Sequence, residues 1–150
     1  CIVPEKREEL TTEGGLDLNH NLDSIKQAVS QLQAAQIKVS LFLDTQIESV
    51  HTAHDLQVDA IEFHTGILEH LPPKHPKTQS FLTSLQTASI QAYHYDISVH
   101  AGHGLNYQNI ALITPTPHLK EVNIGHSIIC RSIWVGLHQA VTEMKALTKI

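Results

Sequence analysis

IEFHTG, at residues 61–66, is the stretch that decides the fold class of this 150-residue chain. Its apolar beginning predicts a short buried strand, and its ending in Gly66 predicts a turn at the carboxyl end of that strand. Other short strands are expected on both sides of it, at residues 1–3, 37–43, 95–101 and 119–124. Helices are expected between them, so the order is β-α repeated five times, which predicts a parallel sheet with helical crossovers.

The helices are expected at residues 22–36, 46–56, 78–92, 107–113 and 127–147. The last of these is expected to be one long amphipathic helix with an apolar stripe, and residues 66–75 are expected to form a loop. Five β-α units fit a small doubly wound sheet, and they also fit part of a (β/α)8 barrel. Since no linker divides the chain, residues 1–150 are expected to form a single domain.

Composition restricts the class of protein. The chain is 41% hydrophobic and 17% charged, as is usual for a soluble protein, and its net charge of −5 argues against a nucleic-acid partner. It has no apolar run long enough to span a membrane and no secretory signal, so we expect a cytoplasmic location. Cys1 and Cys130 lie far apart and are expected to be free, buried thiols.

Glu62 is the first candidate functional residue. Alternate residues of a strand share a face, so Glu62 and His64 point the same way, toward the interior in a barrel. A buried carboxylate without a partner is costly, so Glu62 needs either a salt bridge to a neighbouring strand or a chemical role.

AGHGLNY, at residues 101–107, gives the second candidate, His103. Gly102 and Gly104 flank it, which allows the backbone to turn tightly and to approach a ligand. Imidazole titrates near neutral pH and therefore suits proton transfer. The simpler alternative is a turn histidine whose glycines serve geometry alone.

NIGHSIICR, at residues 123–131, places Gly125 at a strand end, with a helix beginning near His126 and Ser127. Unpaired backbone N–H groups at a helix start favour an anion. The last two strand-helix loops of a barrel often bind phosphate, and these loops would contain Gly104 and Gly125. For Ser127, capping the helix is the simpler interpretation.

Spacing alone leaves two functions open. One is acid–base catalysis on a phosphorylated small molecule by His103 and Glu62. The other is a metal-dependent hydrolase that uses His64, His103 and His126, although the chain lacks paired-ligand spacings such as HxH or HExxH. A fragment without enzymatic activity is a third interpretation.

At these residues the chain resembles the pyridoxine 5′-phosphate synthase family of vitamin B6 biosynthesis. The resemblance is carried by VPEKREELTTEGGLD, VSLFLD, IEFHTG, AGHGLNYQN and EVNIGHSIICRSIWVGLHQAVTEMKAL, which follow the family order over nearly the whole chain. Two departures are His100, where the family usually has Asn, and Thr45-Gln46, where Ala-Asp is common.

The resemblance implies a (β/α)8 TIM barrel that assembles as a homo-octamer and requires no metal or organic cofactor. It implies condensation of 3-amino-2-oxopropyl phosphate with 1-deoxy-D-xylulose 5-phosphate, which gives pyridoxine 5′-phosphate, phosphate and water. It also implies that His103 is the proton donor and that Glu62 stabilises the transition state. Thr11 would bind the deoxyxylulose phosphate. The aminoketone phosphate would be held by Gly104, Gly125 and His126.

In this family the strand that ends in VPEKR is the fourth, so three β-α units with further active-site groups are expected before Cys1. The chain does not begin with Met, which also indicates a cut protein or a piece of a longer chain. We therefore expect this C-terminal part of a barrel to be inactive or nearly so by itself. Its open sheet edges should be covered by the missing part or by self-association.

Overall fold

The computed structural model describes residues 1–4 and 14–148. Its centre is a sheet of four parallel strands in the order β1-β2-β3-β4. The strands are β1 (Ser40–Leu43), β2 (Ala60–His64), β3 (Ser98–Gly102) and β4 (Leu119–Asn123). The expected α/β class with parallel strands is confirmed. A doubly wound sheet reverses its strand order at a switch point, whereas this order is sequential throughout, as in a barrel.

The strand expected at residues 1–3 is reduced to a single bridge. Ile2 pairs in parallel with Leu41, where its N–H donates to the Ser40 carbonyl at 2.8 Å and its own carbonyl accepts from Phe42 N–H at 3.0 Å. This bridge places the start of the chain on the outer edge of β1. Within the described residues, the five expected strands are therefore four strands and one bridge.

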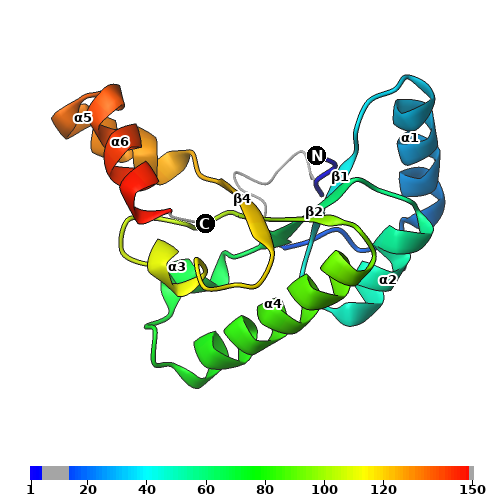
Figure 1. Cartoon of the computed structure of the whole chain (residues 1–150), viewed down its shortest axis with the longest axis horizontal. Helices are drawn as coiled ribbons and strands as arrows, with labels where there is room; N and C mark the ends of the chain where they lie inside the picture. Colours follow the sequence, from blue (N-terminus) through cyan, green and yellow to red (C-terminus); the bar gives the residue numbers. More distant parts are fainter. Residues whose placement is uncertain (5–13, 149–150) are drawn as a thin grey trace.

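Three helices supply most of the packing behind the sheet: α1 (Leu22–Ala34), α2 (Ile47–Asp55) and α4 (Pro76–His94). α4 runs beside the sheet, and α1 lies at one end of the molecule (Figure 1). α4 begins two residues earlier than expected because Pro76 occupies its first turn and the His75 imidazole accepts a hydrogen bond from Lys77 N–H. Pro at this position is favourable since the first N–H groups of a helix have no partner inside it.

Strand alternation separates two faces of the sheet. The fully buried core side chains point toward the helices: Leu41, Leu43, Ile61, Phe63, Val99 and Ala101. The other face carries a row in register across all four strands: Phe42, Glu62, His100 and Glu121. The sheet thus presents a polar face, which in a closed barrel would be the interior, and Glu62 lies on it.

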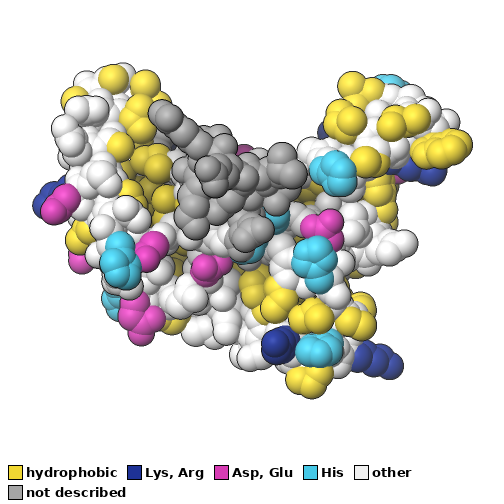
Figure 2. Space-filling model, turned by 180° about the vertical axis from the view of Figure 1, so that it is seen from behind, with side chains coloured by type: hydrophobic (Ala, Val, Ile, Leu, Met, Phe, Trp, Pro, Cys, Tyr) yellow, Lys and Arg dark blue, Asp and Glu magenta, His cyan; other side chains and the backbone are white. Residues whose placement is uncertain are grey.

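The long helix expected at residues 127–147 is two helices, α5 (His126–Val135) and α6 (Leu137–Leu147). Gly136 separates them with a φ of +82°, a left-handed conformation that suits glycine and ends a helix. The apolar stripe is not buried along α5, in which no residue is classed as buried; Ile133 and Trp134 are 77% and 84% exposed. Figure 2 shows hydrophobic side chains gathered on this helix pair.

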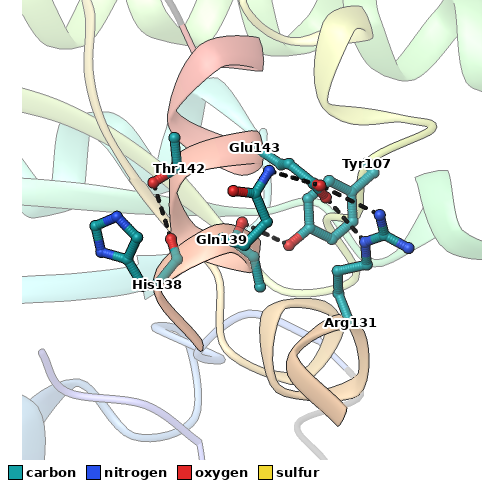
Figure 3. A network of polar contacts seen from close by, with 7 residues as sticks. Tyr107, Arg131, His138, Gln139, Thr142 and Glu143 are labelled. Atoms are coloured by element: carbon teal, nitrogen blue, oxygen red, sulfur yellow. Dashed lines mark hydrogen bonds and ion pairs between the residues drawn. The ribbon is translucent and has the colours of Figure 1, made fainter. Parts of the chain in front are cut away.

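Polar contacts hold the pair together and to the rest of the chain (Figure 3). Arg131 on α5 forms a two-pronged ion pair with Glu143 on α6, at 2.8 and 3.2 Å. The Tyr107 hydroxyl, from the loop after β3, donates to the Ala140 carbonyl of α6 at 2.9 Å. The last residue of AGHGLNY therefore anchors α6 to the loop that follows β3.

Other differences from the sequence expectations are local. The 66–75 segment contains a short helix, α3 (Ile67–His70), and the helix expected at 107–113 is one 3-10 turn, η1 (Ile110–Leu112). β3 begins later than expected because α4 continues to His94 and Asp96 turns the chain with a φ of +58°. Both cysteines are free as expected, but they are exposed and not buried. No helix in the described ranges is long and apolar enough to cross a membrane.

Candidate active site

An open cavity of about 1350 Å³ lies at the carboxyl ends of the strands. Five of the six residues predicted for the site line it: Glu62, His103, Gly104, Gly125 and His126. His64 lines the same cavity. Thr11, predicted to bind a substrate phosphate, lies outside the described residues. The structure thus brings together side chains from the ends of β2, β3 and β4, while their chemical roles remain predictions.

Glu62 points from β2 onto the polar face of the sheet and is held by a neutral partner. The Asn123 amide donates to Glu62 Oε2 at 2.9 Å, across the position of Gly102 on β3. Burial raises the pKa of Glu62, and the hydrogen bond from Asn123 opposes that rise. Among the described residues Glu62 forms no salt bridge. This part of the chain therefore does not show the salt bridge to a neighbouring strand that was the alternative to a chemical role.

His103 follows β3 in a left-handed backbone conformation, with a φ of +73°. Its ring lies 5.1 Å from the ring of His64 and 6.5 Å from that of Phe42, measured between centroids. Burial lowers the pKa of His103, the nearby His64 lowers it further, and Glu69 acts in the opposite direction. The lowered pKa favours the neutral imidazole at neutral pH and makes its protonated form a stronger acid.

His64 is oriented from the other side by Asp44. The His64 Nδ1 atom lies 3.2 Å from Asp44 Oδ1, which also accepts the Gly15 N–H at 3.2 Å. The hydrogen bond to His64 lowers the pKa of Asp44, so this carboxylate stays ionised near neutral pH. His64 Nε2 is buried and has no hydrogen-bond partner among the described residues. Asp44 therefore connects the segment around Gly15 with the histidine pair.

The end of β4 leads directly into α5, so Gly125 lies between a strand end and a helix start, as the sequence predicted. Gly125 precedes the first residue of α5, and open space surrounds it, since a Cβ there would meet no atom within 4 Å. Ser127 does not cap the helix: its hydroxyl donates to the Leu105 carbonyl at 2.8 Å. This bond joins the loop after β4 to the loop that contains Gly104, so the two glycine loops are neighbours at one rim of the cavity.

The metal-site alternative has little geometric support. His64 and His103 lie side by side and His126 lines the same cavity. Nevertheless, no group of three or more His, Cys, Asp or Glu side chains is arranged to hold a metal ion in the part of the chain that the structure describes. The close neighbour of His126 Nε2 is Cys130 Sγ of the same helix, at 3.4 Å.

Sequence reasoning missed three residues of this site. No role was predicted from the sequence for Asp44, Asn123 or Thr65. All three are polar residues at or just beyond the carboxyl end of a strand. That position is the signal that could have identified them, because in parallel α/β folds it faces the site.

Comparison with known proteins identifies the family of this chain. The family model described as pyridoxal phosphate biosynthesis protein PdxJ matches residues 1–150. The chain is 44% identical over 149 residues to the pyridoxine 5′-phosphate synthase of Magnetococcus marinus, covering 99% of this chain and 61% of that protein. It is 45% identical over 149 residues to the protein of the same name from Trichlorobacter lovleyi, covering 99% and 62%.

A third relative, the pyridoxine 5′-phosphate synthase of Opitutus terrae, is 41% identical over 145 residues, covering 97% of this chain and 58% of the relative. The chain thus spans about three-fifths of the length of the curated relatives that it matches. Because the family model covers the chain from its first residue to its last, the chain belongs to the PdxJ family of pyridoxal phosphate biosynthesis proteins.

Proposed function

We propose that the whole protein to which this sequence corresponds is a pyridoxine 5′-phosphate synthase. It would condense 3-amino-2-oxopropyl phosphate with 1-deoxy-D-xylulose 5-phosphate and release pyridoxine 5′-phosphate, phosphate and water. The observation that carries this proposal is the meeting of Glu62, His103 and the two glycine loops on one cavity. The names of the relatives, all pyridoxine 5′-phosphate synthases, support the same reaction.

In this proposal His103 donates a proton to an oxygen that leaves during ring closure. Each loss of water needs such a proton, and an imidazole with a lowered pKa supplies it readily once protonated. Glu62 stabilises positive charge that develops on the condensing nitrogen, because a fixed carboxylate in a partly buried site interacts strongly with nearby charge. Asn123 would keep the carboxylate in place.

The phosphate of the aminoketone would bind at the rim formed by Gly104, Gly125 and His126. The first N–H groups of α5 are available there, and the lack of side chains on the glycines allows close approach. The phosphate of the deoxyxylulose substrate is assigned to the segment that contains Thr11. Neither role requires a metal or an organic cofactor.

The test is an assay of pyridoxine 5′-phosphate formation from the two substrates by a family-length protein. The family-length protein is the present chain joined to the part of the Trichlorobacter lovleyi relative that lies outside their matched residues. His103→Asn should reduce turnover by about 10²-fold or more while leaving phosphate binding largely intact. Turnover equal to that of the unmodified protein would remove His103 from its proposed role, and absence of product from the unmodified protein would overturn the function.

The chain alone is proposed to be an incomplete unit, the C-terminal portion of a single barrel. β4 has a free edge in the described part of the sheet, and α5 exposes a run of apolar side chains. Both features favour association, with the missing part of the barrel or with further copies. Analytical ultracentrifugation tests this: a monodisperse, cooperatively unfolding monomer of the 150-residue chain would contradict it.

For the complete protein we propose a cytoplasmic homo-octamer that acts on phosphorylated small molecules, without nucleic-acid or membrane partners. The negative net charge and the biosynthetic family support this proposal. Sedimentation of the family-length protein would measure its assembly, and a dimer or monomer at working concentration would contradict the octamer.

A further inference from the structure

His103 occupies a backbone conformation that has to be held by its surroundings. Its φ of +73° lies in the left-handed region, which residues with a side chain rarely adopt. Such residues persist where neighbouring groups fix the backbone, and they gather at functional sites. We therefore expect a neighbouring group to hold the backbone of His103 in this turn.

Thr65 contacts the backbone on both sides of His103. It follows β2 directly, and its side chain is completely buried. Its hydroxyl lies 2.8 Å from the Gly102 carbonyl oxygen and 2.6 Å from the His103 carbonyl oxygen. Its backbone N–H also donates to the Gly102 carbonyl at 2.9 Å, which extends the pairing of β2 and β3 by one residue. A hydroxyl carries one proton, so the two carbonyls share a single donor.

These two carbonyls belong to the two peptide groups on either side of the His103 Cα atom. The relative orientation of two such peptide groups is set by the φ and ψ angles of the residue between them. A single buried hydroxyl that binds both carbonyls therefore fixes the backbone of His103, and with it the direction in which the imidazole leaves the chain.

The residue after Thr65 completes this support. A Cβ at Gly66 would come within 2.6 Å of His64 Nε2 and 3.0 Å of His103 Cδ2, so both imidazoles rest on the bare backbone of Gly66. Thr65 and Gly66 thus act from the same strand end, one on the backbone of His103 and the other on its ring.

We propose that Thr65 is a positioning residue for His103, holding the left-handed turn that directs the imidazole into the cavity. This inference rests on the proposed function, in which His103 is the proton donor. It assigns to the Thr of IEFHTG a role that differs from core packing, because packing depends on the shape of this side chain, whereas the support of His103 depends on its hydroxyl.

The experiment compares Thr65→Val with Thr65→Ser in the family-length protein. Valine keeps the shape and removes the hydroxyl, whereas serine keeps the hydroxyl. Thr65→Val should lower kcat by about 10- to 100-fold, since a small misplacement of a catalytic group has effects of that size, with KM changed by less than about threefold. Thr65→Ser should recover kcat to within about threefold of the unmodified protein.

Thr78 provides the matched control. It is also completely buried, its hydroxyl donates to the Pro72 carbonyl at 3.0 Å, and neither of these residues lines the cavity described above. Thr78→Val should leave kcat unchanged. Equal losses of kcat in Thr65→Val and Thr78→Val, or unchanged kcat in Thr65→Val, would overturn the proposal.

A second measurement does not depend on catalysis. Glycine adopts left-handed backbone angles without strain, so in a His103→Gly background the hydrogen bonds of the Thr65 hydroxyl should contribute less to stability. Thr65→Val should therefore lower the melting temperature less in that background than in the unmodified protein. Equal lowering in both backgrounds would overturn the proposal, whether or not Thr65→Val can be assayed. Failure of the proposed function would instead appear as unchanged turnover in His103→Asn, whatever the melting temperatures show.

Discussion

The side chains of Asn123 and Glu62 meet at 2.9 Å although their strands are not neighbours, because β3 lies between them and carries Gly102 at that point. The absence of a side chain at Gly102 leaves room for the contact. A Cβ there would collide with Glu62 Oε1 and would lie 3.2 Å from the Cβ of Asn123. The glycine of the AGHG turn therefore has a second purpose, which is to let a carboxylate and an amide from different strands reach each other.

Replacing Asn123 by Ala should weaken catalysis through Glu62. The hydrogen bond from Asn123 opposes the effect of burial, so its loss should raise the pKa of Glu62 further. In the family-length protein we expect kcat/KM to fall by about tenfold or more, the usual effect of losing a hydrogen bond to a charged group. The acid limb of its pH profile should move to higher pH.

Asn21→Ala is the control, because the Asn21 amide makes a hydrogen bond to the Asp17 carbonyl on the exposed surface. It should leave the pH profile where it was. An Asn123→Ala protein with an unshifted acid limb would show that this amide does not influence Glu62.

Gly102→Ala should affect both folding and activity. The new methyl group would occupy the space of the Glu62 carboxylate and force it to move. Overpacking of this kind costs about 1–3 kcal/mol of unfolding free energy, measurable by urea denaturation of the family-length protein. Gly125→Ala is the steric comparison, since a Cβ there meets open space. Similar stability losses in the two variants would contradict this explanation.

Periodicity and strand-end motifs were sufficient to predict the parallel α/β class and to place Glu62, His103 and Gly125 near one another. They could not predict that Ser127 would bind the Leu105 carbonyl instead of capping its helix, because that partner lies in another loop. The break at Gly136 was also missed, since the apolar spacing of residues 127–147 continues across it. Local pattern determines elements, whereas side-chain partners depend on tertiary contacts.

The sequence predicted the apolar stripe of residues 127–147 but could not predict what covers it. A helical stripe such as Ile129, Ile133 and Leu137 indicates that something covers it, but not which surface does so. In the described part of the chain these side chains are 57%, 77% and 57% exposed. The same spacing would suit burial against the rest of a barrel or against another subunit, so sequence alone could not decide between these partners and the local core.

Glu62→Gln should increase stability at neutral pH while reducing turnover. A carboxyl group whose pKa is raised by folding binds its proton more tightly in the folded state than in the unfolded state. The unmodified protein should therefore lose unfolding free energy as pH rises from the ordinary pKa of 4.5 through the raised pKa of Glu62, and the Gln variant should not. Urea denaturation of both family-length proteins between about pH 4.5 and 8 measures this difference. A constant difference across that range would contradict it.

Asp44→Asn should lower activity by disturbing the orientation of His64. The contribution of Asp44 to stability should depend on pH in the opposite direction to that of Glu62. The hydrogen bond with His64 lowers the pKa of Asp44, so the stabilisation from its carboxylate is present above the ordinary pKa of 3.8 and is lost as pH falls through the folded pKa. Because the side chain is 44% exposed, we expect the loss at neutral pH to stay below about 1 kcal/mol. We expect the loss of kcat to be more marked than the loss of stability, since Asp44 binds both Gly15 and His64, and the His64 ring lies beside that of His103.

Asp17→Asn is the matched control for this prediction. Asp17 also pairs with a histidine, His20, at 2.6 Å, but on the exposed surface near the start of α1. Asp17→Asn should change stability little and kcat not at all, because solvent screens this exposed pair and neither of its residues lines the cavity. Turnover measured in the family-length protein separates the two cases. Equal kcat in the two variants would mean that the carboxylate of Asp44 has no part in ordering the histidines of the cavity.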